Sequence, residues 1–532
     1  MFIDARSLSD GDVVDADICI VGGGAAGISM ALSLAGGPLK VALFESGGID
    51  YEEAAQALYA GPNLGMPTTE LELQRLRFLG GATNHWAGNC MRLDAIDFEA
   101  RPGVPHSGWP IGLKDVEPFY LRAQELTETP ADGPYESAAR RAEVGVAPLD
   151  LDPEKMRSFL YAESPPTAFG YAYEDRLRAA ENVAVYLHAN ALEVETDDRA
   201  ARVERIAMGC IDGPRFSATA RRYVLAAGGI ETPRLLLLSN RVAPAGLGNE
   251  NDLVGRYFMD HYSFRPAFRM LLPDDGASLR LYAEAHDVEG GVVRGAVAAS
   301  EALLRREELP NFAFFVFTSD GKSPGQLSAE AIRRSLGRGE APDRLAHHIG
   351  NLATDLDGLT NEIYATATGS RDHLIARTWL TPWIVCETVP NPESRVRLVE
   401  ERDEVFGQNR IGLDMRLTEA DLRVNKRATE VFAAEMSRLG YGRVWSELLL
   451  DDATWTEPMP HGKHHCGTTR MSADPKTGVV DADCRVHGVS NLHIASSSVF
   501  PTHGFATPTL TIVALALRLA DHLVEEAEGG RL

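Results

Sequence analysis

The sequence predicts an α/β protein, α+β overall, in which one domain is split along the chain by a second domain. Three observations predict this fold. A short apolar strand, a glycine-rich turn, a helix and a second strand follow one another in residues 16–45. The middle of the chain, 263–455, changes to strand-like runs and charged helical segments, which suits a β-sheet backed by helices. The last seventy residues return to a short strand and an apolar helix.

The composition is that of a globular protein with more than one hydrophobic core. The chain has 532 residues, of which 44% are apolar and 24% charged. Its net charge of −24 argues against binding to nucleic acid or to an anionic membrane surface. The N-terminus lacks a secretory signal, and no apolar run reaches the roughly 18 residues that span a bilayer. We therefore expect a cytoplasmic protein.

The six cysteines are scattered and include no CxxC pair. This usage predicts buried free thiols in a reducing compartment rather than a structural zinc site.

The first glycine-rich turn predicts a dinucleotide site. The strand DICIV is followed at once by GGGAAG, in which Gly22, Gly24 and Gly27 fit the pattern GxGxxG. The first glycine permits a tight turn, the second lets the backbone approach a pyrophosphate, and the third lets the helix pack on the strand. The next strand, KVALFE, ends in Glu45, whose carboxylate can accept hydrogen bonds from a ribose. The motif alone does not separate NAD from FAD.

A second glycine loop, FLGGATNHWAGN at residues 78–89, carries flat side chains. Gly80 and Gly81 give a flexible turn, and Asn84, His85 and Trp86 follow it. Such a loop suits contact with a planar ring system.

Together these motifs resemble the glucose-methanol-choline (GMC) oxidoreductases, FAD enzymes that oxidise alcohols. The resemblance runs nearly end to end and is weakest in the middle third. It is carried by the two glycine motifs and by AAGGIETPRLLLLS (226–239), LVGRYFMDH (253–261) and the block from His464 to Leu523. Within the family, the chain is most similar to the sugar-oxidising branch, which includes pyranose oxidases, bacterial glycoside 3-oxidases and fructose dehydrogenase-like proteins.

The resemblance implies a Rossmann-like FAD-binding domain that is discontinuous along the chain. It would comprise 1–155, 180–262 and 456–532, with a substrate-binding domain at 263–455 and a connecting segment at 156–179. The residues expected to contact FAD lie in the glycine turns, the strand ends and the last helix. They are Gly22, Gly24, Gly27, Glu45, Ser46, Gly80, Gly81, Asn84, His85, Trp86, Ala87, Ala227, Thr468, Ser497, Pro508 and Thr509.

Two positions of the second glycine loop bear on flavin chemistry. His85 stands where pyranose oxidases carry a histidine joined covalently to the flavin, so the resemblance makes His85 the candidate for such a link. Ala87 stands where those enzymes carry a threonine near flavin N5, which implies a different reaction with oxygen.

Three expectations concern the rest of the chain. The helix after AAGG is predicted to begin near Thr232 and Pro233, because proline fits a first helical turn. Thr418 is predicted to cap a helix over TEADLRVNKRATEVFAAEMSRLG. Candidates for the substrate wall, each of which also suits a core position, are Trp383, Glu387, Phe315 and Phe317.

The C-terminal block PHGKHHCGTTRM contains the expected catalytic base. The family pattern HxxGTxxM falls on His464, whereas His465 does not fit it. An imidazole with a pKa near neutrality can accept the alcohol proton while hydride leaves the carbinol carbon. The HxxHH run at 461–465 could also suggest zinc, but Gly462 and Gly467 indicate a loop and no acidic ligand is close. No metal is predicted.

The second catalytic partner stays open between Thr507, His503 and a residue of the substrate domain. The sugar-oxidising branch shows Asn-Pro-Thr-Leu-Thr, and this chain has Thr507 in place of the asparagine. A threonine before proline is also a good helix N-cap, so Thr507 is expected to cap the helix TLTIVALALRLADHLVEEA. His503 is the nearest imidazole in sequence.

The sequence therefore predicts an FAD-dependent oxidation of a secondary alcohol, with a sugar or glycoside hydroxyl as the expected substrate. The electrons would pass to O₂ or another acceptor. A non-sugar alcohol (a sterol, a polyol or an aromatic alcohol) and a flavin-fold lyase are the alternatives. An oligomer is compatible with the sequence.

Overall fold

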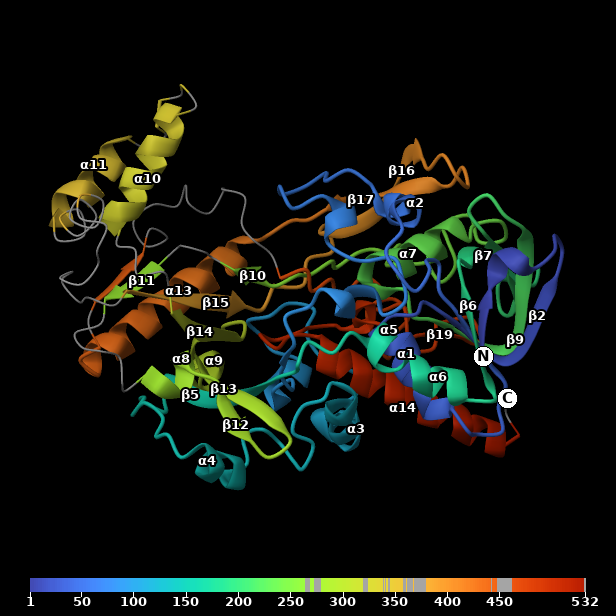
Figure 1. Cartoon of the computed structure of the whole chain (residues 1–532), viewed down its shortest axis with the longest axis horizontal. Helices are drawn as coiled ribbons and strands as arrows, with labels where there is room; N and C mark the ends of the chain where they lie inside the picture. Colours follow the sequence, from blue (N-terminus) through green and yellow to red (C-terminus); the bar gives the residue numbers. More distant parts are fainter. Residues whose placement is uncertain are drawn as a thin grey trace.

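The computed structural model describes residues 1–263, 268–271, 279–318, 324–337, 339, 341–342, 345–356, 360, 367, 379–441, 443–446 and 462–530. Two large β-sheets and the helices around them make up this part of the chain (Figure 1). The predicted combination of a Rossmann-like domain and a second domain built on a sheet is confirmed by the fold.

The first sheet has a parallel centre and an antiparallel edge. Its described strands run in the order β1-β6-β3-β2-β9-β8-β7, and β19 pairs with β9. The pairs among β1, β6, β3, β2, β9 and β19 are parallel, whereas β7, β8 and β9 pair antiparallel. The bounds are β1 Phe2–Asp4, β2 Val13–Val21, β3 Val41–Phe44, β6 Val183–Leu187, β7 Asn190–Thr196, β8 Val203–Gly209, β9 Arg215–Leu225 and β19 Leu492–Ile494.

Helices that connect the parallel strands cover the first sheet. α1 (Ala25–Leu34) follows β2, and α7 (Gly228–Leu238) follows β9. The C-terminal helix α14 (Thr509–Glu528) packs against α1 and against α3 (Leu113–Leu126). Figure 1 shows α14 in red running beneath α1. Parallel strands need such cover because both faces of the sheet are apolar.

The second sheet is built around β14 and β15. Its described strands run in the order β18-β11-β15-β14-β13-β5-β4, with β10 beside β15 and β12 beside β13. The bounds are β4 Asn89–Cys90, β5 Met156–Glu163, β10 Tyr262–Ser263, β11 Phe268–Leu271, β12 His286–Val288, β13 Gly291–Ala299, β14 Phe312–Thr318, β15 Trp379–Cys386 and β18 Arg443–Ser446. A separate hairpin, β16 (Arg395–Arg402) and β17 (Asn409–Asp414), packs beside α7.

One predicted segment needs correction. Residues 156–163, assigned from the sequence to a connecting segment, form strand β5, which pairs along its whole length with β13. The apolar residues of β5 are buried in the second sheet, and this burial outweighs the polar sequence around them.

The helix after β9 starts earlier than predicted. α7 begins at Gly228, so Pro233 lies inside the helix instead of in its first turn. A proline cannot donate to the carbonyl four residues before it, here that of Gly229. The hydroxyl of Thr468 donates to that carbonyl at 2.6 Å. A side chain from a distant segment therefore replaces the missing backbone hydrogen bond.

Other expectations can be compared directly. Thr418 caps α13 (Glu419–Arg438) as predicted, because its hydroxyl accepts from the Asp421 amide. The Asp421 carboxylate in turn accepts from the Thr418 amide. All six cysteines are buried and unpaired, as predicted. Within the described ranges, every helix is too short or too polar to span a bilayer.

The bond between Thr468 and Gly229 predicts a specific loss of stability. Thr468 is fully buried, so Thr468→Val leaves the Gly229 carbonyl without a partner while keeping the side-chain shape. We expect the free energy of unfolding to fall by about 1–3 kcal/mol, measured by chemical denaturation. Thr468→Ser, which keeps the hydroxyl, is the matched control. Equal stability of the two variants would show that the Thr468 hydroxyl does not replace the hydrogen bond that Pro233 cannot make.

Candidate active site

A cavity of about 490 Å³ runs between the two sheets and collects most of the predicted residues. It begins at the turn after β2, passes the second glycine loop and reaches the start of α14. The predicted residues that line it are Gly22, Gly24, Glu45, Ser46, Gly81, His85, Trp86, Ala87, Ala227, His464, Ser497, Thr507, Pro508 and Thr509. Five predicted residues, all described, lie outside the lining: Gly27, Gly80, Asn84, Thr468 and His503.

The turn after β2 is shaped by close backbone contacts. A Cβ atom at Gly22, where φ is +111°, would lie 2.5 Å from the carbonyl oxygen of Ala226. A Cβ at Gly27 would lie 1.9 Å from the carbonyl oxygen of Gly22, so α1 packs tightly on the turn. Gly24 is the N-cap of α1 and has no side chain to cap the first amides. Those amides and the helix dipole therefore favour an anion in the cavity.

Glu45 holds the neighbouring turn as well as facing the cavity. Its carboxylate accepts the Gly23 amide at 2.8 Å and the Gly47 amide at 2.9 Å, and the side chain is buried. These bonds fix the position of the carboxylate against the turn after β2.

Some residues of the second glycine loop hold the loop together, and others line the cavity. Gly80 has φ +97°, and a Cβ there would lie 2.7 Å from the Asn84 amide oxygen. Asn84 itself donates to the Leu79 carbonyl at 2.9 Å, so Gly80 and Asn84 hold the loop together. His85 and Trp86 line the cavity, and the Trp86 indole donates to the Thr167 carbonyl at 3.2 Å. Burial and the nearby Lys463 ammonium lower the pKa of His85, which favours its neutral form.

His464 stands at the junction of the cavity and a buried group of imidazoles. Its Nδ1 lies 2.8 Å from Nδ1 of His261, and its backbone amide donates to Asp260 Oδ1 at 2.8 Å. The neighbouring His465 also borders the cavity, and its Nε2 contacts Gln74 Oε1 at 2.8 Å instead of a second imidazole. His464 is thus the histidine of the HxxHH run that faces both the cavity and the buried imidazoles.

The structure corrects the expected cap of the last helix. Pro508 is the N-cap of α14 and makes no side-chain cap bond. The Thr507 hydroxyl instead donates to the Asn89 carbonyl at 2.6 Å, because the chain before Pro508 runs against the second glycine loop. Thr507 lines the cavity and ties that loop to the start of α14.

His503 lies behind the cavity, not in its wall. Its side chain is 1% exposed, and its Nδ1 lies 2.7 Å from Nε2 of His261. The imidazole of His503 therefore reaches His464 only through His261. His261 connects His503 to His464. It is the last residue of the motif LVGRYFMDH, and no function was predicted for it.

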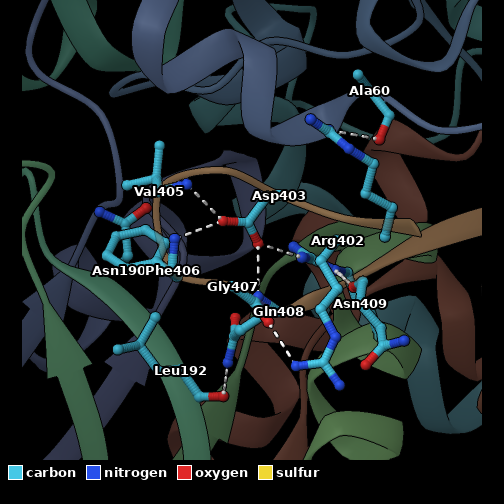
Figure 2. A network of polar contacts seen from close by, with 12 residues as sticks. Ala60, Asn190, Leu192, Arg402, Asp403, Val405, Phe406, Gly407, Gln408 and Asn409 are labelled. Carbon is cyan, nitrogen blue, oxygen red and sulfur yellow. Dashed lines mark hydrogen bonds and ion pairs between the residues drawn. The ribbon is translucent and has the colours of Figure 1, made fainter. Parts of the chain in front are cut away.

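Two further groups of lining residues were not predicted from the sequence. One is the tip of the β16–β17 hairpin, drawn in Figure 2. There the Asp403 carboxylate accepts the amides of Val405, Phe406 and Gln408, and the Gln408 side chain donates to the Leu192 carbonyl at 2.7 Å. These bonds close the hairpin tip over the cavity, where Phe406 and Gln408 form part of the wall.

The other group is a cationic stretch of wall. Arg75 and Arg77 both lie over the Tyr59 ring, with guanidinium carbons 4.2 and 4.8 Å from its centroid. Both approach Glu231, at 3.1 and 3.6 Å. Arg234 joins Glu231 to Asp403. The wall thus carries three guanidinium groups against two carboxylates.

The opposite end of the cavity is aromatic. Phe315 of β14 and Trp383 of β15 are paired in register and line it, together with Trp86 and Phe505. Glu387 is not part of this wall. It is fully buried and pairs with Arg101 at 2.6 Å, and its other oxygen accepts the Asn311 amide at 2.9 Å. The side chain of Phe317 lies outside the described part of the chain.

His461, the first histidine of HxxHH, lies outside the described residues. Among the described ones, no group of three His, Cys, Asp or Glu side chains is arranged to hold a metal ion.

The Arg101–Glu387 pair predicts a large effect on stability. Glu387→Gln leaves the Arg101 cation buried without its counter-charge, so we expect the free energy of unfolding to fall by about 3–5 kcal/mol. Glu401→Gln is the control, because Glu401 is 64% exposed in its pair with Arg410 and surface pairs contribute about 0–1 kcal/mol. Denaturant titration of both variants is the measurement. Equal losses would show that the buried pair contributes no more than a surface pair.

Comparison with known proteins identifies relatives of this chain. Residues 390–516 match the family described as GMC oxidoreductase. The large subunit of fructose dehydrogenase from Gluconobacter japonicus is 24% identical over 98% of this chain and 99% of its own length. The 6'''-hydroxyparomomycin C oxidase of Streptomyces lividus is 26% identical over 96% of this chain and 92% of its own length.

A solved structure extends the likeness to the fold. A formate oxidase variant from Aspergillus oryzae, studied for its FAD modification, superposes with a TM-score of 0.57. It has 17% sequence identity and covers 98% of this chain and 100% of its own. The family match over residues 390–516, the full-length relatives and the shared fold agree with the resemblance drawn from the motifs: the chain is similar to GMC oxidoreductases along its length.

Proposed function

We propose that the protein binds FAD in the cavity and oxidises a secondary alcohol, a sugar or glycoside hydroxyl, to a ketone. The observation that carries the proposal is the position of His464. Its imidazole lines the same cavity as the dinucleotide turn of Gly22 and Gly24 and the start of α14. A proton acceptor, an anion-binding turn and an aromatic wall thus share one enclosed space.

The residues present fit FAD. The uncapped amides of α1 suit a pyrophosphate, and Glu45 suits a ribose. Buried nitrogen atoms of Arg75 and Arg77 in the same wall have no hydrogen-bond partner within the described chain. His85, Trp86 and Ala87 on one side and Pro508 and Thr509 on the other would border the ring system. The amides at the start of α14 favour negative charge beside them.

When bound, FAD supplies the two-electron acceptor for hydride from the carbinol carbon. The chain's own contribution is to bind and orient the alcohol and to remove its proton. His464 is the proposed proton acceptor, since an imidazole can be neutral near pH 7 and still bind a proton. The aromatic side chains of Trp86, Phe315, Trp383 and Phe505 would exclude water and pack against the apolar face of the substrate.

The proposal of a sugar substrate rests on the relatives. The large subunit of fructose dehydrogenase, which is named for a sugar, and the 6'''-hydroxyparomomycin C oxidase match this chain over almost its whole length. The aromatic wall is compatible with that class, because the C–H faces of a sugar ring pack on aromatic side chains.

The His464 assignment predicts a loss of flavin reduction. Purified yellow protein is mixed anaerobically with monosaccharides, glycosides, polyols, a sterol and aromatic alcohols, and the flavin absorbance is followed. We expect bleaching by a sugar or glycoside, and His464→Ala to slow it by about 10²–10⁴-fold because general base catalysis is lost. His487→Asn, a change of an imidazole outside the cavity lining, is the control.

Two outcomes would contradict the proposal. Bleaching by a non-sugar alcohol alone would reassign the substrate class. Turnover without bleaching would indicate the lyase alternative, in which the flavin has a structural role.

His85 lines the cavity, and the resemblance makes it the candidate for a covalent link to the flavin. Its lowered pKa keeps the imidazole neutral and nucleophilic at pH 7. After acid precipitation, the yellow colour should stay with the protein, and in His85→Ala it should appear in the supernatant. Colour released from the unaltered protein would show that FAD is held without a bond to His85.

A further inference from the structure

We propose that His261 is a positioning residue that fixes the proton of His464 on Nδ1 and so leaves Nε2 as the atom that accepts the substrate proton. The inference rests on the proposed function, in which His464 is the base. It adds two residues to that function, His261 and the Gly504 carbonyl, neither of which lies in a sequence pattern for catalysis.

The two imidazoles are brought together where the chain enters and leaves its middle section. Met259 and Cys466 form an antiparallel bridge, with amide–carbonyl distances of 3.1 and 2.9 Å. The Gly462 amide adds a bond to the His261 carbonyl at 2.7 Å. These backbone bonds place His261 and His464 side by side although 203 positions separate them. The rings meet edge to face, with centroids 5.0 Å apart.

The hydrogen bonds of His261 determine which atoms carry protons. Its Nε2 lies 2.9 Å from the Gly504 carbonyl oxygen, which can only accept. Nε2 of His261 therefore carries the proton, and Nδ1 of a neutral His261 has only a lone pair. Across the 2.8 Å contact, His464 Nδ1 must then be the donor. A neutral His464 with its proton on Nδ1 offers an unprotonated Nε2 on the other side of the ring.

The Gly504 carbonyl is held in place by its own surroundings. Gly504 has φ +54°, and a Cβ atom there would lie 2.3 Å from Oδ2 of the buried Asp97. Only glycine fits this turn, because the side chain of a larger residue would strike the Asp97 carboxyl. The acceptor that sets the proton of His261 thus lies in a turn that requires glycine.

Burial keeps His261, which also borders the cavity, and His503 uncharged. His261 and His503 are 2% and 1% exposed. Burial is the main cause that lowers the pKa of both, and the Asp260 and Glu387 carboxylates that face His261 oppose it only in part. At neutral pH both imidazoles are therefore uncharged. They determine which ring nitrogen of His464 carries the proton, and they add no charge beside it.

His503 admits one competing arrangement. Its Nδ1 lies 2.7 Å from His261 Nε2, and its Nε2 lies 3.3 Å from the Thr388 amide. If the Thr388 contact determined the protons, His503 would donate to His261, His261 to His464, and His464 would carry its proton on Nε2. The Gly504 contact is the shorter of the two competing contacts, and we assign the arrangement that it sets. The two arrangements make opposite predictions for His464.

Two substitutions at one position separate the role in orienting protons from a role in packing. In His261→Asn, the amide oxygen occupies the place of Nδ1 and still accepts from His464. In His261→Leu, no acceptor remains. We expect His261→Leu to lower kcat for anaerobic flavin reduction by about 10²-fold, with KM within about threefold. His261→Asn should recover most of that loss.

The pH profile should move as well. A hydrogen bond donated by the imidazolium favours the charged form of His464. Its loss in His261→Leu lowers the pKa of His464, so the acidic limb of the kcat/KM profile shifts to lower pH. His261→Asn should keep the limb near its original place. A purely structural loss would reduce activity without this shift.

A direct measurement does not depend on turnover. The holoenzyme labelled with ¹⁵N-histidine should show His464 with a protonated Nδ1, an unprotonated Nε2 and scalar coupling between the Nδ1 atoms of His464 and His261. Spectra of His464→Ala and His261→Leu assign the signals. If no alcohol bleaches the flavin, the proposed function fails while this spectrum still tests the proton arrangement.

Three results would overturn the inference. They are a His464 that carries its proton on Nε2 at the pH of maximal turnover, a His261→Leu variant with unaltered kinetics and pH profile, and a His261→Asn variant that loses as much as His261→Leu. If His261→Leu does not fold, the spectrum of the unaltered holoenzyme decides alone.

Discussion

The close approach of two backbone turns is the constraint on which the site depends. β2 and β9 are adjacent parallel strands, so the turns that follow them leave the sheet at the same edge. At Gly22 the distance to the Ala226 carbonyl leaves no room for a side chain. The first amides of α1 and the start of α7 therefore border one cavity. A larger residue at Gly22 would separate the turns and remove the surface on which a dinucleotide can lie.

The remaining parts of the site come from segments that the first sheet does not contain. The second glycine loop, the β16–β17 hairpin and the strands β14 and β15 each supply one wall of the cavity. Two of their contacts run to backbone carbonyls, from Thr507 to Asn89 and from Gln408 to Leu192. Carbonyl acceptors fix loops to each other without requiring a matching side chain. A site built in this way holds its shape while the side chains of the aromatic wall can vary.

Much of this arrangement could be predicted from the sequence, because glycine patterns report on backbone geometry. The turn at Gly22 to Gly27, the strand before it and the cap at Thr418 follow from local rules. The chemistry of His503 and Thr507 could not be assigned, since both lie near the motif but face other groups. Their partners, His261 and Asn89, are hundreds of residues away. The hydroxyl of Thr468 was expected at the cofactor, and it instead satisfies a carbonyl that Pro233 leaves free. Only tertiary contacts reveal such partners.

The bridge between Met259 and Cys466 has a consequence for the order of folding. The histidine pair forms only after the 202 residues between His261 and His464 have been synthesised. Contacts between residues so distant in sequence close late, because the entropy of loop closure must be overcome first. The turn of Gly22 and the sheet around β2 involve earlier parts of the chain. A chain still emerging from the ribosome would therefore possess the dinucleotide turn before it possesses its base. Proton removal from the alcohol could begin only after the chain has been synthesised and folded past His464.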